Sequence, residues 1–92
     1  MRTFLISIPP MLLSELPHHT PAVVVSVSDL LAGDPIAGRL RDLGFVKGEP
    51  VRVMTHGPMG KDPLLVQIGY TRFALRRAEA ARITVEPTGA AA

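Results

Sequence analysis

The chain has 92 residues, a formal net charge of +2 and no cysteine. This length allows one domain with one hydrophobic core. The absence of cysteine excludes disulfides, thiolate metal sites and thiol nucleophiles. Ten basic residues are interspersed with eight acidic ones, so the charge gives only weak support for an anionic partner. Nine prolines and eight glycines favour short strands and turns over a helical bundle.

The beginning and the end of the chain differ in composition from its middle. The opening residues are faintly similar to a secretion signal, but Pro9 and Pro10 interrupt the apolar run and no small-residue cleavage site follows. We therefore expect residues 1–10 to be an unprocessed N-terminal extension, with Met11 as an alternative start. Residues 87–92 are expected to form a flexible tail, which leaves one domain over residues 11–86. No apolar run is long enough to cross a bilayer, so we expect no direct membrane insertion.

A short helix and its two ends can be predicted from the middle of the chain. Asp34 can accept hydrogen bonds from the free N–H groups of a first helical turn, and Pro35 suits the first helical position. Apolar residues then recur at helical spacing, at Ile36, Leu40 and Leu43. Gly44 can end the helix in the left-handed conformation, after which Phe45 can fold back onto it. So short a helix is not stable alone, and we expect it to plug one end of a small sheet.

Five short segments have the composition and alternation of β-strands. They are Ala22–Ser28, Pro50–His56, Pro63–Ile68, Arg72–Arg76 and the segment with Ile83 and Val85. Alternation puts Val23, Val25 and Val27 on one face of the first strand, and it turns Arg52 and Met54 outward in the second. The predicted fold class is mostly β: a small antiparallel barrel of about five strands with one short helix plugging the barrel. A barrel also protects its strand edges.

Three sequence blocks, taken in order, resemble the FeoA family. They are RLRDLGFVKG with the strand VRVM, the turn GKDP before LLVQIG, and FALRRAEAARITV near the end. Together they span about residues 12–86, and the resemblance implies an SH3-like barrel. One departure is visible, because the turn of the family usually reads Gly-Asp-Pro whereas Lys61 here separates Gly60 from Asp62. Contacts that relatives make at this turn therefore do not transfer to this chain.

The resemblance also implies a function. FeoA proteins are small cytosolic accessory proteins of bacterial ferrous iron uptake, thought to bind the cytosolic part of FeoB, the GTP-binding membrane protein that imports ferrous iron. We therefore expect a cytoplasmic, non-enzymatic protein that docks on FeoB and supports or regulates it. The same fold occurs in metal-dependent repressors, so the alternative is a metal-responsive sensor or carrier, or a repressor-like SH3 module.

The residues themselves indicate no catalytic function. No spacing pairs a nucleophile with a base, and the phosphate-binding pattern GxxxxGK[ST] is absent. An arginine finger acting on a partner GTPase is chemically feasible, but nothing in the sequence selects one arginine for it.

His18, His19 and Glu15 are the candidate metal ligands, while His56 lies elsewhere in the sequence. Imidazole and carboxylate groups suit Zn²⁺ or Fe²⁺. Adjacent histidines in an extended loop point opposite ways, so the two would serve two sites or two molecules. The expected metal site is weak or intermolecular, and the alternative is a solvated, proline-flanked loop.

Two kinds of side chain are candidates for a partner-binding surface. Arg72 and Arg76 share the outward side of their strand, where they can meet an anionic partner. Met54, Leu65 and Tyr70 are apolar residues that alternation or a turn should expose. If they cluster they mark a binding groove, a role that suits the pliable side chain of methionine.

The alternative is that these residues have no function. Six arginines can contribute to a basic surface, namely Arg39, Arg41, Arg72, Arg76, Arg77 and Arg82. Local pairing of Arg39 and Arg77 with Asp42, Asp62 or Glu79 would leave mostly solvated charge. A nucleic-acid-binding barrel would more often expose aromatic rings for base stacking, and the chain has only four aromatic residues. We therefore expect no nucleic-acid partner.

Overall fold

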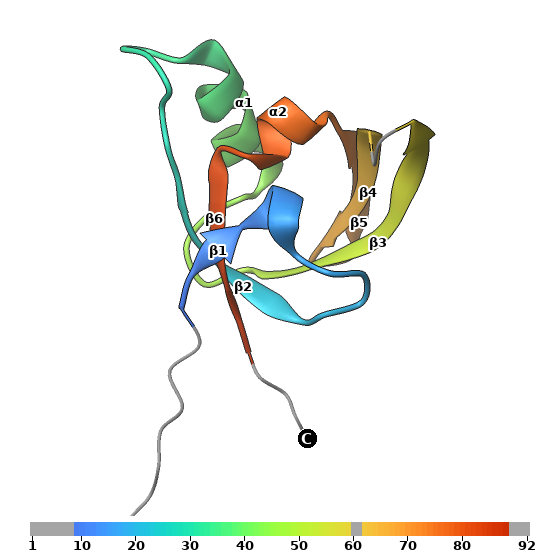
Figure 1. Cartoon of the computed structure of the whole chain (residues 1–92). Helices are drawn as coiled ribbons and strands as arrows, with labels where there is room; N and C mark the ends of the chain where they lie inside the picture. The colour runs from blue at the N-terminus through green and yellow to red at the C-terminus, as the bar shows by residue number, and fades with distance from the viewer. Residues whose placement is uncertain (1–8, 60–61, 89–92) are drawn as a thin grey trace, which may run out of the picture.

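The computed structural model of the chain describes residues 9–59 and 62–88. Its elements follow in the order β1 (Met11–Leu12), the 3-10 turn η1 (Leu13–Glu15), β2 (Ala22–Val27), α1 (Pro35–Leu43), β3 (Pro50–Met59), β4 (Asp62–Ile68), β5 (Thr71–Leu75), α2 (Arg77–Ala80) and β6 (Ile83–Pro87) (Figure 1). The prediction of a mostly β protein is confirmed. Six strands replace the expected five, because the two-residue β1 pairs with β6. Most of the expected N-terminal extension and tail, and Lys61, lie outside the described residues.

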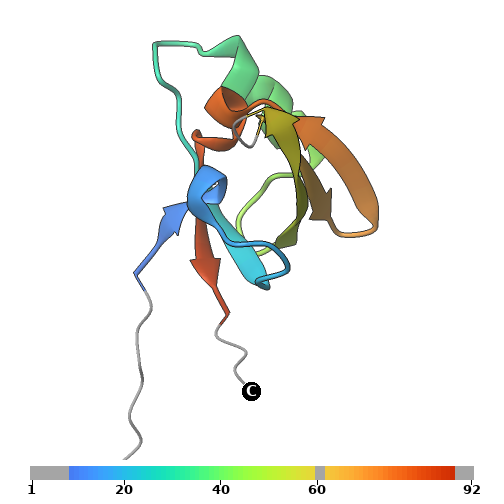
Figure 2. The ribbon, with the colours of Figure 1, turned by 45° about the vertical axis from the view of Figure 1, so that its right-hand side comes forward.

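The six strands form one antiparallel sheet in the order β1-β6-β2-β3-β4-β5. The pairing of β2 with β3 is limited to two residue pairs, whereas β3 pairs with β4 along most of its length. Because this join is short, the sheet bends there into two halves, β1-β6-β2 and β3-β4-β5, which face each other across the core (Figures 1 and 2). The predicted strongly bent barrel is therefore present, with β1 and β5 as the two ends of its strand order.

A bulge in β2 changes which of its residues face the core. Ala22 and Val24 are buried, while Val23 and Val25 are only half-buried, so the prediction that Val23, Val25 and Val27 share one face fails at the bulge. The register with β6 shifts between Val24 and Ser26. After this shift Val27 packs against the core. An irregularity of this kind reverses the alternation from that point on.

The helix α1 has the ends predicted for it. The side chain of Asp34 accepts hydrogen bonds from the backbone N–H groups of Ile36 and Ala37, at 3.0 and 3.5 Å. Gly44 is left-handed with φ of 116°, and the N–H of Phe45 donates to the carbonyl of Leu40 over 3.1 Å. Leu40 is buried in the core, and α1 lies beside α2 at one end of the two sheet halves (Figures 1 and 2).

The hairpin of β3 and β4 also follows the predicted alternation in most of its length. Leu64, Val66 and Ile68 of β4 are buried, as is Val53 of β3. The strand β3 is longer than predicted, because it continues past His56 to residue 59. The register of β3 against β4 shifts between Val53 and Thr55, which leaves Met54 in a bulge.

The core lies between the two sheet halves and is almost entirely aliphatic. Its buried residues are Leu13, Leu16, Ala22, Val24, Leu40, Phe45, Val51, Val53, Leu64, Val66, Ile68, Leu75, Ala80, Ile83 and Val85. Phe45 is the largest of them and its ring is 6.1 Å from that of Phe73, which packs against the core from β5. Over residues 9–59 and 62–88, no helix has the length and apolar character needed to span a membrane.

Candidate functional site

The outer face of β3-β4-β5 carries two cross-strand rows of side chains. The rows are Arg52–Gln67–Arg72 and Thr55–Leu65–Ala74. Arg52 and Arg72 are exposed, Leu65 is half-buried, and the Nε of Arg72 donates to the Oε1 of Gln67 over 3.2 Å. In the described part of the chain, neither arginine has an acidic side chain within ion-pair distance. We call these two rows the outer-face patch, a surface of uncompensated positive charge beside an apolar side chain.

A shallow groove of about 170 Å³ adjoins the outer-face patch where β2 meets β3. Arg52 and Gln67 line one part of it, and Pro21 and Pro50 line another. The groove therefore extends the first row of the patch toward β2.

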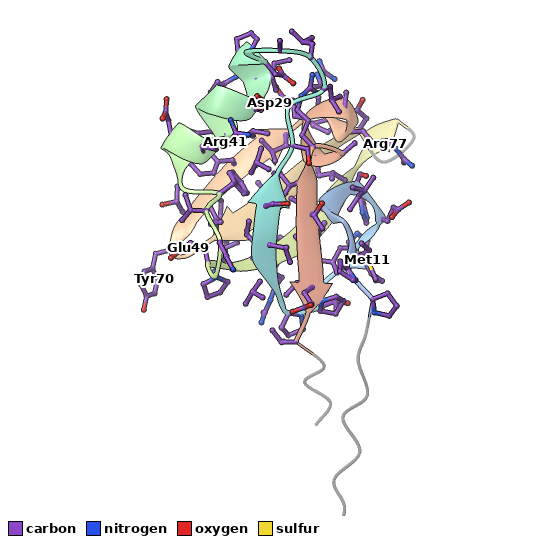
Figure 3. The ribbon with its side chains drawn as sticks, turned by 90° about the vertical axis from the view of Figure 1, so that its left-hand side faces the viewer. Met11, Asp29, Arg41, Glu49, Tyr70 and Arg77 are labelled. Carbon is purple, nitrogen blue, oxygen red and sulfur yellow. The ribbon has the colours of Figure 1, made fainter. Side chains whose placement is uncertain are left out.

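The other predicted partner residues are spread along the same hairpin. Met54 is half-buried in the bulge of β3. Tyr70 is fully exposed in the turn before β5, and Figure 3 shows it pointing away from the body of the protein. Arg76 follows the other end of β5, about 20 Å from Tyr70 at roughly 3.3 Å per residue. The structure thus brings Leu65 and Arg72 onto one face and leaves Tyr70 and Arg76 at its two ends.

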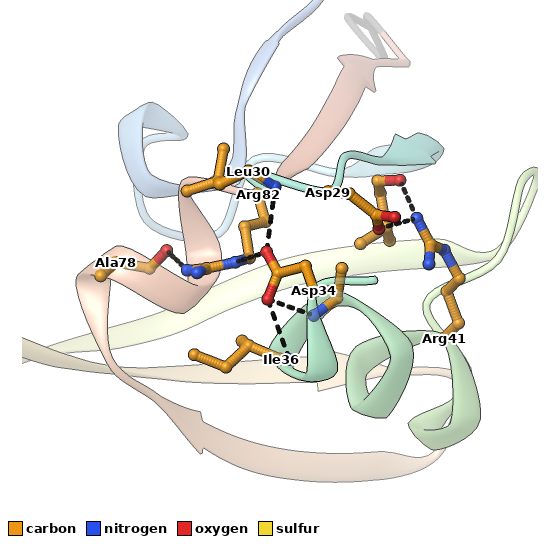
Figure 4. A network of polar contacts seen from close by, with 9 residues as sticks. Asp29, Leu30, Asp34, Ile36, Arg41, Ala78 and Arg82 are labelled. Carbon is orange, nitrogen blue, oxygen red and sulfur yellow. Dashed lines mark hydrogen bonds and ion pairs between the residues drawn. The ribbon is translucent and has the colours of Figure 1, made fainter. Parts of the chain in front are cut away.

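Most of the other arginines have local acidic partners. The Nη2 of Arg41 lies 2.8 Å from the Oδ1 of Asp29, an ion pair drawn in Figure 4, and the side chains of Arg39 and Arg76 lie 3.9 Å from those of Glu79 and Asp62, respectively. These pairs are exposed and contribute little to stability, so they mainly offset charge. Among the described arginines, Arg52, Arg72 and Arg77 are exposed and have no acidic side chain within ion-pair distance, and of these Arg52 and Arg72 lie in one row of the outer-face patch.

Arg82 is not part of a basic surface, contrary to the sequence-based expectation. Its side chain is only 9% exposed, and its Nε donates to the Oδ2 of Asp34 over 2.8 Å (Figure 4). Its Nη1 donates to the carbonyl of Ala78, also over 2.8 Å. The same Oδ2 of Asp34 accepts the N–H of Leu30 over 3.0 Å. A buried ion pair therefore fixes the loop before α1 to the segment between α2 and β6.

These contacts lower the pKa of Asp34. The hydrogen bond from Leu30 and that from Arg82 are the two largest causes, the N–H groups of Ile36 and Ala37 add to them, and burial acts in the opposite direction. The net result is a pKa of about 2, compared with an ordinary value of 3.8. Asp34 is thus a carboxylate that the fold holds ionised, and its role is structural.

Two histidines from distant parts of the sequence lie in direct contact. The Nε2 of His18 faces the Nδ1 of His56 within hydrogen-bond contact, and the two ring centroids are 4.0 Å apart. The ring of His19 is 5.9 Å from that of His18. The structure therefore adds His56 to the predicted histidine candidates, and the pair His18–His56 is the closest grouping of imidazoles.

The backbone around this pair explains its geometry. The bulge at Met54 shifts the register so that His56 stands opposite Leu64, and Leu64 points into the core. His56 is thereby turned to the inner side of β3. The loop that carries His18 is fastened to the same strand, because the N–H of His19 donates to the carbonyl of Val53 over 2.8 Å. His19 itself is left-handed, with φ of 60°.

Glu15 does not join the histidines. Its Oε1 accepts the backbone N–H of Leu12 over 3.3 Å and so closes the turn η1. Over residues 9–59 and 62–88, there is no group of three or more histidine, aspartate or glutamate side chains that could hold a metal ion. The predicted set of His18, His19 and Glu15 is therefore not assembled within the described chain.

A family model for the FeoA domain matches residues 11–87. The chain belongs to the FeoA family. This membership agrees with the three sequence blocks and with the bent six-stranded sheet. No curated protein gives a significant match.

Solved structures of FeoA proteins are similar to the chain. One is FeoA from Stenotrophomonas maltophilia in complex with zinc, described as a prokaryotic SH3 domain protein. It is 66% identical to this chain, the match covers 83% of this chain and 89% of that chain, and the TM-score is 0.77. FeoA from Chlorobium tepidum is 38% identical over 85% of this chain and 70% of that chain, with a TM-score of 0.72. The predicted SH3-like fold is confirmed. A manganese-dependent transcriptional repressor, 18% identical over 90% of this chain and 44% of that chain with a TM-score of 0.73, shares the fold alone.

Proposed function

We propose that this FeoA protein is a cytoplasmic, non-enzymatic accessory protein of ferrous iron uptake that docks on the cytosolic, GTP-binding part of the transporter FeoB. The FeoA match over residues 11–87 is the observation that carries this proposal. The relative from Stenotrophomonas maltophilia, described as a candidate ferrous iron transport activating factor, supports the same role.

The outer-face patch is the docking surface that we propose. Arg52 and Arg72 provide positive charge that no carboxylate of the described residues pairs with, and Leu65 provides apolar area beside them. Charged groups around an apolar centre are typical of protein interfaces, where they steer association and fix orientation. The groove beside Arg52 adds a concave edge for a partner side chain. A partner with an acidic surface fits this patch best.

A contribution of Met54, Tyr70 and Arg76 is part of the same proposal. Tyr70 is placed to reach a partner beyond the end of the hairpin, because its side chain is fully exposed. Arg76 is expected to contribute less than Arg72, since Asp62 lies 3.9 Å from its Nη1. Met54 is half-buried and can contribute only through its exposed part.

Binding of the purified protein to the nucleotide-loaded cytosolic domain of FeoB, and to intact FeoB, tests the proposal. We expect Arg72→Glu to weaken binding about tenfold, equivalent to about 1.4 kcal/mol, mainly through slower association. Higher salt should weaken the binding of the unaltered protein more than that of this variant. Arg76→Glu should have a smaller effect.

Lys47→Glu is the matched control, because it makes the same change of charge at an exposed residue of the turn between α1 and β3. It should bind as the unaltered protein does. Equal weakening by Lys47→Glu and Arg72→Glu would show a general charge effect and remove the assignment of the patch. No association with either form of FeoB, in any nucleotide state, would refute the docking function itself.

A further inference from the structure

We propose that His18 and His56 form a two-imidazole binding site for a divalent transition-metal ion, which binds zinc more tightly than ferrous iron. The proposal differs from a site built on the adjacent pair His18 and His19. It is also independent of the docking function, because it concerns the inner side of β3 rather than the outer-face patch.

The first argument is the convergence of two nitrogen atoms. The Nε2 of His18 and the Nδ1 of His56 face each other, although the two residues are 38 positions apart in the sequence. In the metal-free protein one nitrogen donates its hydrogen to the other. The same two nitrogens can instead bind one cation once the donating ring carries its hydrogen on its other nitrogen, because the deprotonated nitrogen of a neutral imidazole is a metal ligand.

The second argument is that the backbone holds both rings in place before any ion binds. His56 lies on a strand that pairs with β4, and its side is set by the bulge at Met54. His18 lies in a loop fastened to β3 through the N–H of His19 and the carbonyl of Val53. Ligands supported by fixed backbone lose little conformational freedom on binding, which favours affinity.

The third argument is access. His18 is exposed and His56 is half-buried, so the rings can adjust to the Zn–N distance of about 2.0–2.1 Å while water fills the remaining positions of a tetrahedral ion. Imidazole nitrogens favour zinc over ferrous iron in the usual affinity order of divalent metals. We therefore infer that this histidine pair binds zinc more tightly than ferrous iron.

Calorimetric titration of the full chain with zinc chloride tests the assignment. We expect one zinc ion per chain, and an affinity at least tenfold lower for both His18→Ala and His56→Ala. His19→Asn is the matched control, since asparagine tolerates the left-handed backbone of residue 19. It should keep the affinity within twofold. Ferrous iron, titrated without oxygen, should bind at least tenfold more weakly than zinc.

Nuclear magnetic resonance of the imidazole nitrogens provides a second readout that does not depend on the variants. Zinc should shift the ring signals of His18 and His56 and leave those of His19 in place, while circular dichroism checks that each variant is folded. Equal zinc affinity of the unaltered protein and both alanine variants would refute the site. A loss in His19→Asn as large as in His18→Ala, or tighter binding of ferrous iron than of zinc, would also overturn the assignment.

Discussion

Truncation of Phe45 to alanine is the sharpest test of how the core holds α1 against the sheet. The side chain is 1% exposed and follows the left-handed Gly44 that ends the helix. Removing a buried phenylalanine side chain costs about 3–5 kcal/mol. A 92-residue domain at about 0.05–0.15 kcal/mol per residue has a free energy of unfolding of about 5–14 kcal/mol in all. Phe45→Ala should therefore remove about a fifth or more of the stability.

The expected loss corresponds to a fall in melting temperature of about 12–40 °C, taking about 4–8 °C per kcal/mol for a domain of this size. Far-UV circular dichroism during urea or thermal unfolding is the suitable measurement. Intrinsic fluorescence is a poor probe here, because the chain has no tryptophan and its single tyrosine, Tyr70, is fully exposed.

Phe73→Ala is the matched control, because Phe73 packs against the core but is only half-buried. It should cost about half as much as Phe45→Ala. The ring centroids are 6.1 Å apart at an interplanar angle of 50°, so the double variant should reveal a coupling of about 0.5–1.5 kcal/mol. A loss in Phe45→Ala no larger than that in Phe73→Ala would refute the view that Phe45 anchors the helix to the core.

Two further predictions concern α1 and Asp34, the residue that caps its first turn. The pKa of Asp34 is about 2 in the folded protein and 3.8 without its partners, so the unfolded state takes up the proton first as the pH falls. The free energy of unfolding should therefore decrease as the pH drops from about 4 to 2. Acid unfolding followed by circular dichroism should show a shallower decrease in Asp34→Asn, and an equal decrease would contradict the assignment. Gly44→Ala should destabilise the protein by about 1–2 kcal/mol, since φ is 116° there. Gly38→Ala, inside α1 and with open space around the added Cβ, should stabilise the protein by about 0.5–1 kcal/mol. If the melting temperatures of Gly44→Ala and Gly38→Ala moved in the same direction, the difference in backbone strain between the two positions would be refuted.

Local signals in the sequence were sufficient for much of the fold. Asp34 and Gly44 define the ends of α1 through contacts within a few residues, and such contacts depend on the residue types themselves. The alternation of apolar residues predicts a strand at Pro63–Ile68, and because β4 is regular, this alternation places Leu64, Val66 and Ile68 on its buried face. The resemblance to FeoA then added the SH3-like arrangement.

The candidate sites depend on contacts that local patterns cannot predict. No sequence signal connects Arg82 with Asp34, which lies 48 residues earlier, so the sequence alone predicts a surface arginine at this position. No local signal connects His56 with His18 either, since strict alternation from Val53 turns His56 outward. The register shift that turns it inward is a property of the paired strands, and it becomes visible only with the partner strand in place.

The single unpaired residue at Met54 has a consequence for how FeoA sequences are compared. The extra residue reverses the alternation of side chains after Val53. Because of this reversal, His56, two positions after Met54, faces the interior. In a relative without this insertion, an aligned histidine would face solvent and have no imidazole to meet. Counting the residues along β3 is therefore a better guide to the histidine pair than the presence of the two histidines alone.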